Sequence, residues 1–109
     1  MRTEGQLRAV AFQEGDVWVV HGVEYDLVAQ TKELLDVPTA FLQTVTNTIL
    51  INRRMGRNGL EAIQAAPLKY LEMFESAEME LTPRGPLPVR DEVSRPDISL
   101  RAYRHQEVA

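Results

Sequence analysis

Residues 7–20 read LRAVAFQEGDVWVV, and this stretch decides the fold. In its first half, two sets of side chains alternate along the chain, which is typical of a β-strand with a buried face. The turn residues that follow include Gly15, which can adopt the positive φ of a tight hairpin turn. Residues 17–21 are rich in β-branched and aromatic side chains and predict a second strand. The stretch therefore predicts a β-hairpin.

A third strand and a first helix are predicted after the hairpin. Residues 23–31 alternate between apolar and polar side chains, which predicts a third antiparallel strand. We expect a helix after the capping residue Asp36, because Pro38 suits a first helical turn and Gly56 suits the position after a helix. Residues 44–51 are rich in β-branched side chains and also fit a strand, but the signals at both ends favour the helix.

The rest of the chain predicts a second helix and an extended tail. Pro67 suits a helix start, and apolar side chains line one side of the helix as far as Leu81. Residues 82–109 hold four of the six prolines, so we expect an extended tail in which residues 98–103 alternate like a single strand. The predicted fold class is α+β, with a three-stranded antiparallel sheet backed by two α-helices over residues 1–81 and a proline-rich tail over residues 82–109.

The composition excludes several kinds of site. The 109 residues include no cysteine and two histidines, which excludes disulfides, thiolate sites and multi-histidine metal centres. No apolar run approaches the ~20 residues of a membrane span, and no apolar segment follows the polar N-terminus, so we expect a cytoplasmic protein without a signal peptide. The net charge is −4, and residues 1–81 carry seven basic and twelve acidic side chains. This acidic body disfavours nucleic-acid binding and favours a basic protein partner.

Glu24 and Asp26 are the strongest candidates for a catalytic or metal-binding pair, because residues two apart on a strand point to the same face. The first strand carries no carboxylate between Arg8 and Phe12, however. We therefore favour a solvated strand face, and we expect no catalytic residue, no metal and no cofactor. A metal-dependent hydrolase that uses this pair is the third alternative.

Three other features have both a functional and a structural interpretation, and we favour the structural one for each. His21 can act as a general base, but we expect it at the partly exposed end of a strand. Trp18 can stack on a ligand, but we expect it in the core. The basic cluster can bind phosphate, but it suits the C-terminal end of a helix dipole; its members are Arg53, Arg54 and Arg57.

Residues 9–20, AVAFQEGDVWVV, and residues 24–30, EYDLVAQ, resemble the beginning of HicB-family antitoxins. In that family, a hairpin with an acidic, glycine-bearing turn leads to a third strand that ends in Ala-Gln, and then to a helix. The resemblance covers residues 7–55, and residues 67–74, PLKYLEMF, are similar to the end of some HicB-like proteins. It implies a HicB-like fold and a small basic ribonuclease toxin as the protein partner.

The predicted function is that of a HicB-like antitoxin-type binding protein, which neutralises its toxin by protein–protein contact. The alternative is a toxin-less homo-oligomeric interaction or structural module of the same fold. We predict a homodimer, because a lone tail strand cannot satisfy its own backbone groups and can dock on the sheet edge of a second copy. The residues expected to contact a partner are Glu24, Asp26, Ile98, Leu100, Arg101 and Tyr103.

Overall fold

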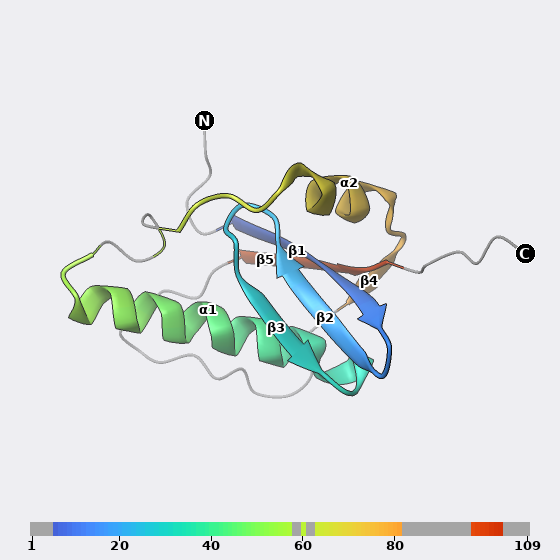
Figure 1. Cartoon of the computed structure of the whole chain (residues 1–109), viewed down its shortest axis with the longest axis horizontal. Helices are drawn as coiled ribbons and strands as arrows, with labels where there is room; N and C mark the ends of the chain where they lie inside the picture. Colours follow the sequence, from blue (N-terminus) through green and yellow to red (C-terminus); the bar gives the residue numbers. More distant parts are fainter. Residues whose placement is uncertain (1–5, 58–59, 61–62, 82–96, 104–109) are drawn as a thin grey trace, which may run out of the picture.

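The structure is a computed structural model, and it describes residues 6–57, 60, 63–81 and 97–103 (Figure 1). It confirms the α+β class. The described elements are, in chain order, β1 (Gln6–Glu14), β2 (Val17–Gly22), β3 (Val28–Thr31), the 3₁₀ turn η1 (Leu34–Asp36), α1 (Val37–Arg54), α2 (Leu68–Ser76), β4 (Met79–Leu81) and β5 (Asp97–Ala102).

The sheet has five strands in the order β3-β2-β1-β5-β4, so the prediction of a three-stranded antiparallel sheet is wrong. β5 lies between β1 and β4, and it runs parallel to β1 and antiparallel to β4. Ala9 of β1 is paired with Leu100 of β5. The alternating tail segment is therefore an inner strand of the chain's own sheet, and residues 1–81 alone do not complete that sheet.

The sheet carries a helix on each face (Figure 1). Successive residues of a strand point to opposite faces, so β1 is buried on both sides. On the α1 side, the buried core consists of Leu7, Ala9, Ala11, Val20, Leu27, Val37, Phe41, Val45 and Leu100. On the α2 side, it consists of Val10, Val23, Phe74 and Ala77.

The local signals for the hairpin and for α1 are confirmed, with one exception. Gly15 has a φ of 58° in the β1–β2 turn, and Gly56 has a φ of 79° after α1. Pro38 lies in the first turn of α1. The Asp36 side chain makes no capping hydrogen bond, contrary to expectation. Asp36 belongs to η1, and the Val37 N–H donates to Leu34 O, so the helix continues from a 3₁₀ turn instead of beginning at a side-chain cap.

By length and composition alone, the helical stretch Leu34–Arg54 could cross a membrane. A core helix meets the same criterion, so the cytoplasmic location expected from the sequence stays a prediction. Val37, Phe41 and Val45 are fully buried against the sheet, so packing accounts for the apolar residues on this face of α1.

The third strand is shorter than predicted, because it begins at Val28 instead of residue 23. The Gly22 N–H donates to Leu27 O over 2.8 Å, and this bond closes a loop between β2 and β3. A Cβ atom on Gly22 would lie 2.5 Å from the Tyr25 carbonyl oxygen. The loop can therefore fold back this tightly only because residue 22 is glycine.

The second helix is also shorter than predicted. It begins at Leu68, directly after Pro67, and it ends at Ser76 instead of continuing to Leu81. Ala77 is extended, with a ψ of 138°, and the next residues form β4 along β5. Pairing with a strand far along the chain thus overrides the helical pattern of this segment.

Candidate functional site

Glu24 attaches the β2–β3 loop to β1. Its Oε1 accepts a hydrogen bond from the Arg8 backbone N–H over 2.7 Å, and its Oε2 pairs with Arg8 Nε over 2.5 Å. The Arg8 guanidinium also lies over the Phe74 ring of α2, 5.8 Å from its centroid. The carboxylate of Glu24 is therefore engaged within its own chain.

His21 is buried, so its expected position at a partly exposed strand end is wrong. Its ring stacks on Tyr70 of α2, with the centroids 3.7 Å apart and the planes 11° apart. Its Nδ1 lies 3.0 Å from Gly22 O, and its Nε2 lies 3.2 Å from Asp26 Oδ1. The side chain thus connects β2, the β2–β3 loop and α2.

Glu24 and Asp26 do not form the carboxylate pair considered for catalysis. Both lie in the loop before β3, and they turn to different partners, Arg8 and His21. Within residues 6–57, 60, 63–81 and 97–103, no group of three or more His, Asp or Glu side chains could hold a metal ion. The absence of enzymatic activity stays a prediction.

The predicted partner residues of the tail pack inside this chain. Leu100 is 3% exposed, and Ile98 packs against the same core. Arg101 Nη1 donates to Phe74 O over 3.1 Å, and its guanidinium lies 4.4 Å from the Phe74 ring centroid. The Tyr103 N–H donates to Ala11 O over 2.7 Å.

β5 therefore has hydrogen-bonding partners on both sides without a second copy. A partner could reach Leu100 only if the strand left its place in the sheet, whereas Ile98, Arg101 and Tyr103 are partly exposed. The contacts of the tail with a partner, and the homodimer, stay predictions.

Two other interpretations can be compared with the structure. Trp18 is half-buried and packs against the core on the α1 side, which agrees with a packing role. The three arginines at the end of α1 are exposed, where they suit the negative end of the helix dipole. We call this group the basic end; its members are Arg53, Arg54 and Arg57.

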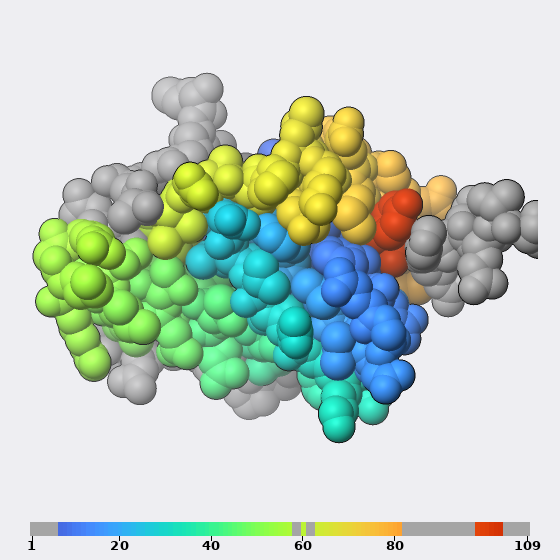
Figure 2. All heavy atoms as spheres, viewed as in Figure 1, coloured from blue at the N-terminus to red at the C-terminus, as the bar shows by residue number. Residues whose placement is uncertain are grey.

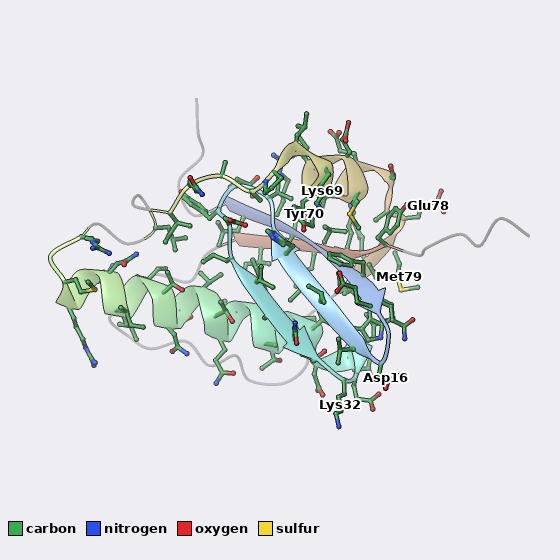
Figure 3. All side chains as sticks on the ribbon, in the orientation of Figure 1. Asp16, Lys32, Lys69, Tyr70, Glu78 and Met79 are labelled. Carbon is green, nitrogen blue, oxygen red and sulfur yellow. The ribbon has the colours of Figure 1, made fainter. Side chains whose placement is uncertain are left out.

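Four exposed carboxylates lie in the β1–β2 turn and in the segment after β3, at one end of the sheet. β3 is antiparallel to β2, with Thr31 paired with Trp18, so these two segments lie at the same end of the sheet. Figure 3 shows Asp16 and Lys32 there together. We call this group the acidic end; its members are Glu14, Asp16, Glu33 and Asp36. The ion pairs of Arg8 with Glu24 and of His21 with Asp26 involve none of these four.

β3 forms one edge of the sheet, next to the acidic end. It lies at the molecular surface on the face seen in Figure 2, where it is coloured cyan. Val28 is 45% exposed, and Gln30 is exposed as well. The sequence predicted a sheet with open edges, and β3 is one of the two edge strands in the described sheet.

Comparison with protein-family models, with curated proteins and with solved structures finds no match for this chain. The resemblance to HicB-family antitoxins therefore stays a prediction.

Proposed function

We propose that this protein is a HicB-like antitoxin-type binding protein that neutralises a small basic ribonuclease toxin by protein–protein contact. The observation that carries the proposal is the acidic end. It presents four carboxylates and one ammonium group, that of Lys32, on adjacent surface segments. Such a surface attracts a basic partner, raises its association rate and disfavours acidic competitors.

The charges of the described surface are also polarised along α1. The acidic end includes Asp36, directly before the helix, whereas the basic end lies in and just after its last turn. An 18-residue helix is about 27 Å long, so the two groups are well separated. A basic partner would therefore approach with a preferred orientation, with its positive surface toward the β1–β2 turn.

The test is growth rescue. The proposal requires a small basic protein encoded beside this gene; that protein is expressed with and without this chain, and relief of growth arrest is measured. The charge-reversed variant Asp16→Lys/Glu33→Lys changes the acidic end, and Glu72→Lys/Glu75→Lys makes the same change in net charge on the exposed side of α2.

We expect the acidic-end variant to lose rescue and to bind the purified toxin at least about tenfold more weakly at low salt. The α2 variant should behave like the wild type. Equal rescue by both variants, or no binding between the wild type and the neighbouring protein, would contradict the proposal.

The alternative, a toxin-less homo-oligomeric module, stays a prediction. The case for strand exchange between copies is weaker, because β5 pairs with β1 and β4 of its own chain. Mass in solution over a range of concentrations separates the two functions. A persistent dimer that binds no neighbouring basic protein would favour the module.

A further inference from the structure

We propose that the open edge of β3 binds an extended, basic segment of the partner as a sixth strand of the sheet. This inference rests on the proposed function and names the contact by which the toxin is held. Main-chain hydrogen bonds to β3 would provide the attachment, and carboxylates beside the strand would select basic side chains.

The pairing with β2 shows which backbone groups of β3 point outward. The Gly22 N–H donates to Leu27 O, so the carbonyl of residue 27 faces β2, and successive residues of an antiparallel strand face alternate neighbours. Ala29 and Thr31 are therefore bonded to β2 as well. Val28 and Gln30 occupy the alternate positions, so their N–H and C=O groups point away from the sheet.

The chain already uses this edge once. The Asp26 N–H, which lies two residues before Val28 in the same outward series, donates to Gln64 O over 2.8 Å. The next outward positions, Val28 and Gln30, have no such partner among the residues that the structure describes. An added strand would lie along the edge of β3, directly after the segment that contains Gln64.

The two edges of the sheet differ in their protection against added strands. β4, at the opposite edge, is three residues long and carries the exposed charge of Glu80. Short length and charged side chains are common ways to block an edge. β3 has four residues, none of them charged, and no proline. The accessible edge is therefore that of β3.

The surroundings of β3 identify the chemistry of the occupant. Asp26 precedes the strand, Glu33 and Asp36 follow it, and all three are exposed. Lys32 is the one basic residue among them. Exposed apolar side chains, Val28 and Leu35 (60% exposed), lie within the same stretch. Basic side chains combined with apolar ones fit this surface better than an acidic or wholly polar segment.

The probe is a synthetic eight-residue peptide of alternating lysine and valine, with an alternating glutamate–valine peptide as its control. Binding is followed on the full chain by the chemical shifts and hydrogen exchange of its backbone amides. We expect the lysine peptide to slow exchange at Val28 and Gln30 by about tenfold or more, and the glutamate peptide to have no effect.

A matched pair of variants separates backbone from side chain. Gln30→Pro removes the outward N–H at a position where an edge strand tolerates proline, whereas Gln30→Ala keeps the N–H and removes the side chain. We expect Gln30→Pro to weaken peptide binding about tenfold and Gln30→Ala to bind like the wild type. If Gln30→Pro does not fold, the exchange measurement on the wild type decides.

Unchanged exchange at Val28 and Gln30, protection at β4 instead, or protection that grows with protein concentration in the absence of peptide would overturn the inference. The last outcome would assign the edge to a second copy. Toxin rescue distinguishes this failure from failure of the proposed function. If Gln30→Pro folds and still neutralises the toxin while the acidic-end variant does not, the function stands and the added strand is wrong.

Discussion

Arg101 provides a direct test of how α2 is held on the sheet. Substitution Arg101→Met keeps much of the length of the side chain and removes its guanidinium. That group donates to Phe74 O over 3.1 Å, lies within 3.5 Å of Ala77 O, and covers the Phe74 ring at 4.4 Å. It thus adds a second donor to Phe74 O, which also accepts from the Ala77 N–H over 3.2 Å, and it ties the end of α2 to β5.

The expected loss follows from these contacts. One charged hydrogen bond and one half-buried cation–π contact together contribute about 2–4 kcal/mol to the free energy of unfolding. For a domain of this size, such a loss lowers the melting temperature by roughly 10–20 °C. Arg101→Lys keeps the charge but not the planar group, so about half of the loss is expected to remain.

The assay is urea denaturation followed by circular dichroism, with hydrogen exchange to locate the change. We expect exchange to rise first in α2 and β4, which Arg101 connects. A change within about 0.5 kcal/mol for Arg101→Met would refute the role of the guanidinium in docking α2. If stability were unchanged and toxin binding were lost, the partner role predicted from the sequence would be favoured instead.

Three further substitutions or deletions test other contacts. Gly22→Ala places a Cβ about 2.5 Å from the Tyr25 carbonyl oxygen, so thermal denaturation should show a loss of roughly 2–4 kcal/mol in the free energy of unfolding. A loss below about 1 kcal/mol would mean that the loop adapts. Trp18→Ala should cost about 3 kcal/mol by urea denaturation, because the ring packs at the margin of the core, and an unchanged midpoint would return Trp18 to the candidate ligand contacts. Deleting residues 97–109 removes an inner strand with the buried Leu100, so circular dichroism should show no cooperative unfolding; a stable truncated protein would contradict this place for β5.

The candidate site could be predicted only in part. The acidic character of the body was evident from composition, because charge needs no three-dimensional information. The contacts that individual side chains make were not evident from composition. Glu24 pairs with Arg8 across two strands, and His21 stacks on Tyr70 from a distant helix. Contacts between residues this far apart in the sequence leave no local sequence pattern. A solvated carboxylate pair and a surface histidine were therefore expected, and both interpretations were incorrect.

The sequence by itself determined the hairpin and α1, because their signals are local. These signals are the alternation over a few residues, the glycine at the turn and the proline in the first helical turn. Each affects only residues that are close to it in the sequence. Gly15 and Gly56 adopt the positive φ that their positions suggest. These parts of the fold depend on backbone conformations that are determined by residues close together in the sequence.

Only the tertiary structure decided the role of the tail and of residues 79–81. β5 is parallel to β1, and a parallel pair joins segments with no turn between them, so alternation alone cannot reveal the partner. Burial of Leu100 against Ala9 and hydrogen bonds on both sides favour the inner position. With β5 in this position, Met79–Leu81 pair with it as β4 and form the edge of the sheet opposite β3.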